Sequence, residues 1–187
     1  MGKLVVFNSV SLDGYFTDAN ADMSFAHNPI PDAEWNDFVS GNAQGGGMLL
    51  FGRITYDLMT KFWPTPLAQE TMPVVAERMN NLPKVVFSRS MNSAEWNNTK
   101  LIKVNMIAEI RKMKDDLDIG MAVMGSGSIV SQLAQNGLID EYQIVVIPVV
   151  LGKGRTTFEG ITKKIPMKLV TTRTFANGNI YITYKPN

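Results

Sequence analysis

The sequence predicts an α/β fold of three layers, α/β/α, built around a mixed β-sheet. From residue 4 to residue 137, short apolar runs typical of buried strands alternate with stretches whose apolar residues recur at helical spacing. Beyond residue 140 no helical pattern separates the last two extended stretches, and Asn177-Gly178 is a strong hairpin signal. We therefore expect a sheet that begins parallel and ends with antiparallel strands at one edge.

The elements of the first half follow from apolar runs and turn residues. Leu4–Asn8 is a valine-rich strand that leads into the Asp13-Gly14 turn, and Pro31-Asp32 offers a helix start. The remaining expected elements are a helix end near Gly41 before the Gly45–Gly47 run, strands at Met48–Phe51 and Lys84–Phe87, and helices at Thr55–Lys61 and Ala68–Asn80, the last disturbed by Pro73.

The second half continues the alternation and then becomes extended. Apolar residues at 106, 110, 113 and 117 predict a surface helix, and Asn136-Gly137 marks the end of the next helix. That second helix has Ile129, Val130, Leu133 and Ala134 on its inner face. The expected strands are Lys100–Val104, Ile119–Met124, Glu141–Leu151, Met167–Phe175 and Asn179–Lys185.

Composition excludes several classes of function. With 187 residues, 45% of them hydrophobic and 19% charged, the chain is expected to form one globular domain, residues 1–187. The formal net charge is +1 and the basic residues are scattered, so nucleic acid is not an expected partner. The chain has no cysteine, which excludes disulfides, a thiolate nucleophile and cysteine-ligated zinc.

No membrane segment is expected. The longest apolar run, Ile144–Leu151, is interrupted by Pro148 and is much shorter than the roughly 20 residues that span a bilayer. The first apolar stretch is cut short by Asn8 and Ser9, and no small-residue cleavage site follows it. We therefore expect a cytoplasmic protein.

The stretch Gly125-Ser126-Gly127-Ser128 stands between an expected strand and an expected helix. Two glycines let the backbone approach a phosphate closely, and the free amides of a helix start favour an anion. The dinucleotide fingerprint would need a third glycine where Val130 stands, so a standard Rossmann unit is not expected. Two interpretations remain open: a phosphate-binding turn, or a tight turn with Ser126 or Ser128 as the helix N-cap.

Two further groups of residues follow strands in the same way. Gly52 ends one strand, and Arg53 and Thr55 open the next helix, where an arginine can bind a phosphate and a threonine can cap the helix or donate to the same ligand. Ser88-Arg89 follows the next strand. Taken singly, each group is also compatible with a solvated surface. Because ligands of open α/β sheets bind at the carboxyl ends of strands, the coincidence favours one phosphate-binding site.

Hydrolytic and metal chemistry have little support. The single histidine, His27, lies in a loop of turn-forming residues, and one imidazole without cysteine does not build a usual zinc site. A serine triad would need the same histidine, and no G-x-S-x-G occurs. Asp13, Glu34 and Asp37 are the carboxylates nearest the expected cleft, and carboxylates beside a helix start are usually structural. No metal site is expected.

An ordered set of motifs resembles a known family. The set is similar to the dihydrofolate-reductase-like family that includes the C-terminal reductase domain of the bifunctional riboflavin biosynthesis enzyme, and the match runs from Lys3 to Lys185. The motifs are, in order, SVSLDGYF, FGRITYDLMTKFWP, LPKVVFSRS, EWNNTKLI, VMGSGSIVSQLAQNGLIDEY and PVVLGKGRTTF. The resemblance implies a mixed eight-stranded sheet flanked by helices, with NADPH lying across the ends of its central strands.

The resemblance also implies roles for individual residues. It places Arg53 and Thr55, with Gly52, at cofactor phosphates, Ser88 and Arg89 at the adenosine end with its 2′-phosphate, Gly125, Ser126, Gly127, Ser128 and Ile129 at the pyrophosphate, and Ser9, Val10 and Asp13–Tyr15 near the nicotinamide. Asp13 and Glu34 are the candidate proton donors. Since the cofactor supplies the hydride, such an enzyme needs no nucleophile, which fits a chain poor in histidine and cysteine.

The expected function is therefore an NADPH-dependent reductase of a small heterocyclic or carbonyl compound, most similar to the reductase of riboflavin biosynthesis. The sequence departs from that pattern at Tyr15-Phe16, where riboflavin-pathway reductases usually have a basic residue, and it has no arginine within Lys61–Glu70 to bind a folate tail. A dihydrofolate or pterin reductase, a non-catalytic NADP-binding module and a phosphosugar-binding protein or transferase remain alternatives. The resemblance and the long C-terminal strands favour a homodimer.

Overall fold

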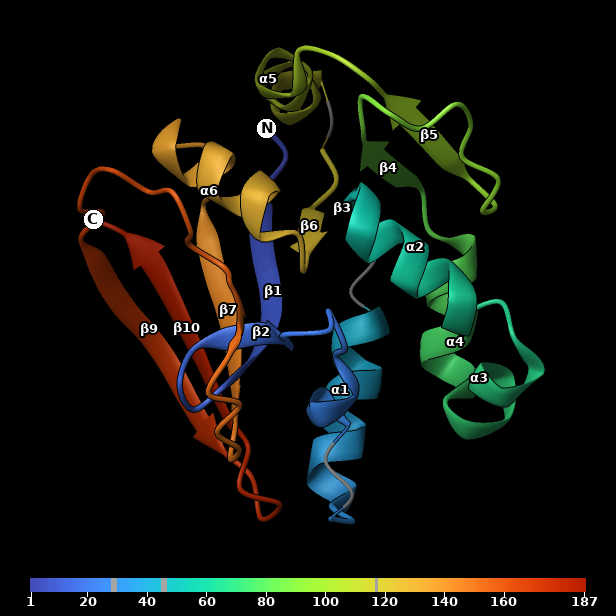
Figure 1. Ribbon diagram of the computed structural model, residues 1–187, viewed down its shortest axis with the longest axis vertical. Coiled ribbons are helices and arrows are strands. Elements are labelled where there is room, and N and C mark those ends of the chain that lie inside the picture. Colours follow the sequence, from blue (N-terminus) through green and yellow to red (C-terminus); the bar gives the residue numbers. More distant parts are fainter. Residues whose placement is uncertain (28–29, 45–46, 117) are drawn as a thin grey trace.

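One mixed sheet organises the computed structural model, which describes residues 1–27, 30–44, 47–116 and 118–187 (Figure 1). Its strands are β1 (Leu4–Ser11), β3 (Met48–Gly52), β4 (Lys84–Phe87), β5 (Thr99–Ile102), β6 (Met121–Met124), β7 (Glu141–Ile147), β9 (Met167–Thr174) and β10 (Ile180–Pro186), in the spatial order β5-β4-β3-β6-β1-β7-β10-β9. The strands from β5 to β7 pair in parallel, whereas β10 pairs antiparallel with both β7 and β9. The predicted mixed eight-stranded sheet with antiparallel C-terminal strands is confirmed.

Helices cover both faces of the sheet, which confirms the three layers. On one face lie α1 (Ala33–Gln44), α2 (Arg53–Phe62), α3 (Pro66–Thr71) and α4 (Pro73–Asn81), and on the other lie α5 (Met106–Asp116) and α6 (Gly127–Gln135). Alternate residues of β3 serve the two layers. Leu49 and Phe51 pack with Tyr56 of α2, while Leu50 packs with Ile110 of α5. This alternation is the two-residue period of a strand that is buried on both faces.

Several boundaries differ from those predicted. The helix expected over Ala68–Asn80 is two helices, because Pro73 cannot donate to a preceding turn and instead opens α4. Helix α1 runs through Gly41 to Gln44 rather than ending there. Strand β7 ends before Pro148, which lacks the amide that the ladder would need. Leu117, Gly45 and Gly46 lie outside the described residues.

A small second sheet is absent from the sequence-based prediction. It consists of β2 (Tyr15–Asp18) and β8 (Gly154–Thr156), which pair antiparallel and which we call the β2–β8 ribbon. A short 3₁₀ helix, η1 (Ser24–Ala26), follows β2 along the chain. The ribbon crosses the sheet near the carboxyl end of β1 (Figure 1). It adds a wall to the site described below.

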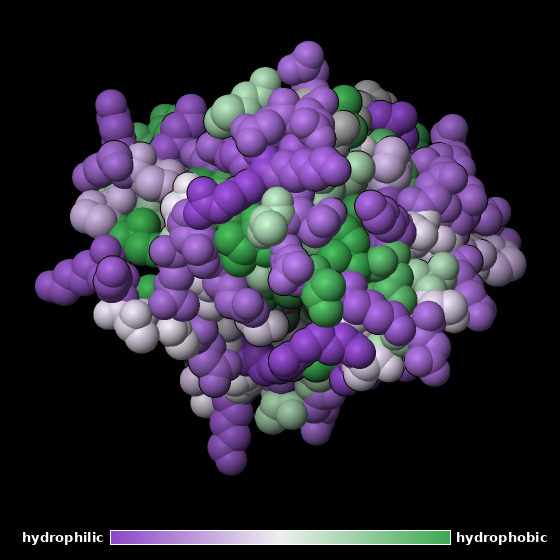
Figure 2. All heavy atoms as spheres, turned by 90° about the horizontal axis from the view of Figure 1, so that it is seen from above, coloured by the Kyte–Doolittle hydropathy of each residue, from purple (hydrophilic) through white to green (hydrophobic). Residues whose placement is uncertain are grey.

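None of the helices in the described ranges combines the length and the apolar character that a transmembrane helix needs. The view from above, onto the end of the molecule where α5 lies, shows mostly hydrophilic residues with hydrophobic ones between them (Figure 2).

Candidate functional site

The residues that follow β3 and β6 meet in one cleft of about 310 Å³ at the carboxyl ends of these strands. The first turns of α2 and α6 both contribute to it. The predicted cofactor residues among its lining are Gly52, Arg53, Thr55, Ser126, Gly127, Ser128 and Ile129. The structure therefore brings together two of the three groups that the sequence singled out.

The segment Gly125-Ser126-Gly127-Ser128 joins β6 to α6, and we call it the glycine turn. Its backbone is unusual. Gly125 and Ser126 both lie in the left-handed region, with φ of 59° and 58°, which glycine adopts freely and serine rarely does. The Asn8 side chain on β1 contacts both backbone groups of Gly125: its Oδ1 accepts from the Gly125 amide at 2.5 Å, and its Nδ2 lies 3.4 Å from the Gly125 carbonyl oxygen. We call this pair of contacts the Asn8 clamp. Asn8 is buried, so this clamp is shielded from water.

Ser126 does not cap α6 with its side chain. Its Oγ instead accepts from the Gly52 amide at 2.7 Å and lies 3.0 Å from the Thr55 Oγ1, which also accepts from the Ser126 amide at 3.1 Å. The turn is thus bonded sideways to α2. Ser126 is thus the N-cap residue of α6 by position, as one of the two interpretations predicted, but its side chain bonds across to β3 and α2 rather than to its own helix.

Two amides at the start of α6 remain available. Ile129 and Val130 donate to the Ser126 carbonyl at 2.8 and 3.0 Å. Within the described residues, no acceptor lies opposite the amides of Gly127 and Ser128, and both residues line the cleft. Unpaired amides at a helix start attract anions.

Arg53 brings a positive charge to the same cleft. Its Nη1 lies 3.6 Å from the Asp57 Oδ2, and both side chains are about half exposed. An exposed pair within one helix contributes only about 0.3–0.5 kcal/mol, so the guanidinium can turn toward an anion at little cost. Thr55, in contrast, is buried and its hydroxyl is already bonded to Ser126.

The remaining predicted cofactor residues do not line the cleft; they are Ser9, Val10, Ser88, Arg89 and Gly125. Ser88 and Arg89 directly follow Phe87, which is a lining residue, and the Ser88 Oγ accepts from the amides of Ser90 and Met91 at 3.3 and 3.2 Å. Ser9 and Val10 are half-buried in β1 and pair with β7. Their contacts with a cofactor stay predictions.

The two predicted proton donors are held in other contacts. Asp13 accepts from the Ser11 hydroxyl at 2.6 Å and from the amides of Leu151 and Gly152 at 3.1 and 2.7 Å. These hydrogen bonds, first of all the one from the Ser11 hydroxyl, lower the pKa of Asp13 to about 2. The Glu34 carboxylate pairs with Arg173 on β9 at 2.6 Å. Neither residue lines the cleft, so their role as donors stays a prediction that these contacts do not favour.

The single histidine lies outside the candidate cleft. His27 is 6.2 Å from Phe62, ring centre to ring centre, and is not part of the cleft lining. Among the described residues, no three side chains of histidine, cysteine, aspartate or glutamate are grouped so as to hold a metal ion.

Sequence reasoning missed the part of the cleft that the β2–β8 ribbon provides. Phe16 and Thr17 from β2 and Arg155 and Thr156 from β8 all line it. The signals for this segment were a glycine pair with basic residues, Gly152-Lys153-Gly154-Arg155, and its place in the motif PVVLGKGRTTF, and neither predicts a strand at the cleft. Without the fold, nothing connects that segment to a turn about 30 residues earlier.

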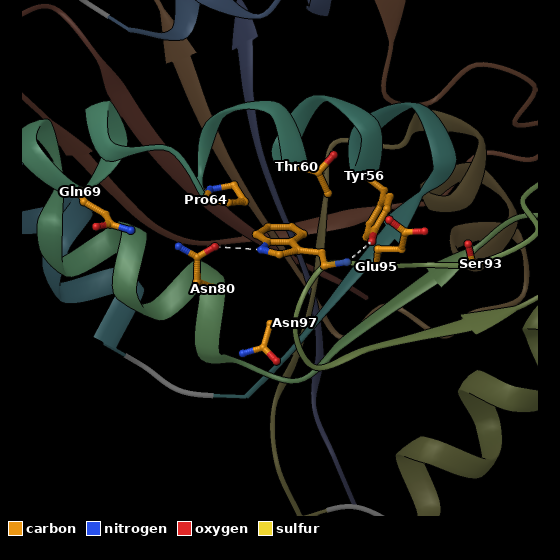
Figure 3. Close-up of a pocket in the computed structure, with 9 residues that line it drawn as sticks. Tyr56, Thr60, Pro64, Gln69, Asn80, Ser93, Glu95 and Asn97 are labelled. Atoms are coloured by element: carbon orange, nitrogen blue, oxygen red, sulfur yellow. Dashed lines mark hydrogen bonds between the residues drawn. The ribbon is translucent and has the colours of Figure 1, made fainter.

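A larger cavity, of about 720 Å³, lies elsewhere, between α2, α4 and the segment before β5 (Figure 3). Trp96 lies in its wall, with its amide donating to the Tyr56 hydroxyl at 2.9 Å and its indole N–H to Asn80 at 2.8 Å. Its lining includes the carboxylate of Glu95 and neither lysine nor arginine. Its chemistry does not suit a phosphate, so the smaller cleft is the candidate site.

Comparison with known proteins gives matches along nearly the whole chain. The family model described as the RibD C-terminal domain matches residues 2–181. The Bacillus subtilis (strain 168) proteins YyaP and YwjB are similar to the chain. YyaP is 28% identical over 185 residues, with 99% of this chain and 95% of YyaP covered. YwjB is 26% identical over 176 residues, with 92% of each covered.

Solved structures share the fold. A protein from Shewanella sp. PV-4 whose name links it to riboflavin biosynthesis has a TM-score of 0.78 at 21% identity, with 99% of each chain covered. Dihydrofolate reductase from Enterococcus faecalis, complexed with NADP(H), has a TM-score of 0.66 at 17% identity, with 100% of this chain and 97% of that chain covered. The deaminase/reductase of Thermotoga maritima has a TM-score of 0.67 at 17% identity, with 100% of this chain and 57% of that chain covered.

Proposed function

The chain belongs to the RibD C-terminal domain family, and from this premise we propose that it is an NADPH-dependent reductase. Its substrate would be a small heterocyclic or carbonyl compound, and the activity would be most like that of 5-amino-6-(5-phosphoribosylamino)uracil reductase in riboflavin biosynthesis. We further propose that it acts in the cytoplasm. The observation that carries the proposal is the cleft in which Arg53 and the unpaired amides of Gly127 and Ser128 lie together.

The chemistry of this cleft fits a dinucleotide. The Asn8 clamp and the Thr55 hydroxyl fix the glycine turn, so the two amides are in place before any ligand arrives. Preorganised donors avoid the cost of ordering on binding. The bound form of NADPH would supply the hydride, and the protein would bind the phosphates, orient the ring and exclude water.

The contacts of the two predicted proton donors do not favour proton transfer from either of them. The Asp13 carboxylate, with a pKa of about 2, is ionised at neutral pH and has no proton to give. Glu34 is paired with Arg173 outside the cleft lining. These contacts favour a second candidate, a module that binds NADP without transferring a hydride.

A turnover assay separates the two candidates. Purified protein is mixed with NADPH and a panel of pyrimidine, pterin, imine and carbonyl substrates, and oxidation of the cofactor is followed by its absorbance. The reductase proposal expects turnover with one class, reduced strongly in Arg53→Gln. Binding of NADPH without oxidation by any class would favour the non-catalytic module, and no binding at all would contradict both.

We also propose a homodimer formed through the C-terminal strands. Strand β9 is at the edge of the sheet and nearly all of its residues are exposed, including Leu169 and Val170. A long exposed edge strand is a template for pairing with another chain. Sedimentation velocity tests this. A monomer at all concentrations would contradict it, as would a dimer that persists in Val170→Lys.

A further inference from the structure

The β2–β8 ribbon brings a second arginine to the candidate cleft. Arg155 lies on β8 and lines the same cleft as Arg53. Glu159 also lines it, yet no ion pair joins Arg155 to a carboxylate within the described part of the chain, whereas Arg53 has Asp57. An arginine without a counter-ion in a concave site is suited to binding an anionic ligand.

The ribbon is seated directly on the first turn of α6. A Cβ atom added to Gly127 would lie 2.6 Å from the Thr156 carbonyl oxygen and 3.0 Å from the Phe16 ring. A Cβ added to Gly154 would lie 1.9 Å from the Thr17 carbonyl oxygen. Backbone therefore packs closely against the ribbon at Gly127, and the two strands of the ribbon pack closely against each other at Gly154.

Both flanks of β8 are tied to other elements. Before it, the Asp13 carboxylate accepts from the amides of Leu151 and Gly152. After it, the Ser131 hydroxyl of α6 donates to the Glu159 carbonyl at 2.7 Å, and the Asn8 Nδ2 lies 3.4 Å from the Thr157 Oγ1. Arg155 thus extends from a fixed backbone. When it binds a ligand, only its side chain loses conformational entropy.

The two arginines stand on different sides of the glycine turn. Helix α2 reaches the turn through Thr55, which bonds Ser126, and β8 reaches it through Thr156, which contacts Gly127. The unpaired amides of Gly127 and Ser128 belong to the same turn and line the same cleft. A diphosphate carries a charge on each phosphate, so the two guanidiniums and the amides can bind it together.

We propose that Arg155 is a second cation of the cofactor site and binds the diphosphate bridge of the dinucleotide from the side opposite Arg53. The proposal rests on the proposed function and adds a residue and a segment to it. The sheet order separates Arg155 from the residues predicted to bind the 2′-phosphate. The Ser88-Arg89 pair follows β4, whereas the ribbon joins segments after β1 and β7, on the far side of β3 and β6.

The test compares binding of three ligands to four proteins. NADPH, NADH and adenosine 2′-monophosphate are titrated by calorimetry into the unaltered protein, Arg155→Gln, Arg155→Lys and Arg111→Gln, the last an exposed arginine on α5 as a matched control. Melting temperatures of all four confirm that each is folded. We expect Arg155→Gln to weaken NADPH and NADH alike by about 10- to 100-fold, the usual range for one charge-assisted contact. Binding of adenosine 2′-monophosphate should not change.

The remaining outcomes each have one meaning. Arg155→Lys should fall between the unaltered protein and Arg155→Gln, because it keeps the charge and loses the planar fork, and Arg111→Gln should bind like the unaltered protein. If Arg155→Gln binds NADPH normally, or loses affinity for NADPH but not for NADH, the assignment to the diphosphate is overturned while the reductase proposal stands. If the unaltered protein binds neither dinucleotide, the proposed function itself fails.

Discussion

Replacing Gly125 with alanine should destabilise the protein through two separable effects. The residue has φ of 59°, and an added Cβ would lie 2.8 Å from the Thr55 Oγ1 and 2.9 Å from its Cγ2. A left-handed conformation costs a residue with a Cβ about 1–2 kcal/mol. Forcing a methyl group against a buried side chain costs about 1–3 kcal/mol, so we expect a total loss of about 2–5 kcal/mol.

Gly137 provides a matched control for the backbone effect. Its φ is 64°, and the residue follows α6 at the surface. Within the described part of the chain, nothing apart from its sequence neighbours lies within 4 Å of the place that an added methyl group would take. Gly137→Ala should therefore lose only the conformational part, about 1–2 kcal/mol. The difference between the two variants measures the contact between the turn and Thr55.

Urea denaturation followed by circular dichroism gives the free energy of unfolding of each variant. We expect Gly125→Ala to lose at least about 1 kcal/mol more than Gly137→Ala, because it alone forces the contact with Thr55. The same variant should bind NADPH more weakly, since a shifted Thr55 releases the Ser126 amide. Equal losses for the two alanine variants would refute the claim that the turn is packed against α2.

Three other perturbations have defined outcomes. Burial lowers the pKa of Lys84 from 10.5 to about 8. Between these pH values the unfolded chain binds more protons than the folded one, so the stability of the unaltered protein relative to Lys84→Met should rise with pH, by at most about 3 kcal/mol. A stability difference that does not change with pH in urea denaturation would contradict this. Glu34→Gln breaks an exposed pair with Arg173 and should cost about 0–1 kcal/mol while leaving turnover unchanged, whereas a large fall in kcat would restore Glu34 as a proton donor. The pKa of Asp13 is lowered to about 2, chiefly by the Ser11 hydroxyl, so its stabilising contribution is present above about pH 4 and is lost as the pH falls toward 2. Thermal melts of Asp13→Asn between these pH values should lack this loss of stability. A melting-temperature profile identical to that of the unaltered protein would contradict the stabilising role of Asp13.

The strands and helices were predictable where a local pattern decides them. Both bounds of β4, Lys84–Phe87, follow from its apolar run, and the hairpin at Asn177-Gly178 follows from turn chemistry. The β2–β8 ribbon was not predictable, because its strands have four and three residues. Such short segments are held by packing against α6 rather than by their own sequence.

The site was predictable only in part. Gly52-Arg53 and the turn at Gly125 follow strands, so their meeting at one end of a parallel sheet could be expected. The Asn8 clamp joins residues 117 positions apart, and no local pattern reports such a bond. Asp13 illustrates the reverse case. A carboxylate near an expected cleft resembled an acid, but its acceptors are filled by the loop that leads into β8.

The central claim is that a reduced dinucleotide binds at the glycine turn, which joins β6 to α6 and lies beside α2. Chemical-shift mapping of ¹⁵N-labelled protein during an NADPH titration tests it most directly. We predict that the largest shifts occur at the amides of Gly127 and Ser128, which have no acceptor among the described residues. Shifts concentrated at Trp96 and Asn80, in the wall of the larger cavity, would contradict the account, as would no shifts at all.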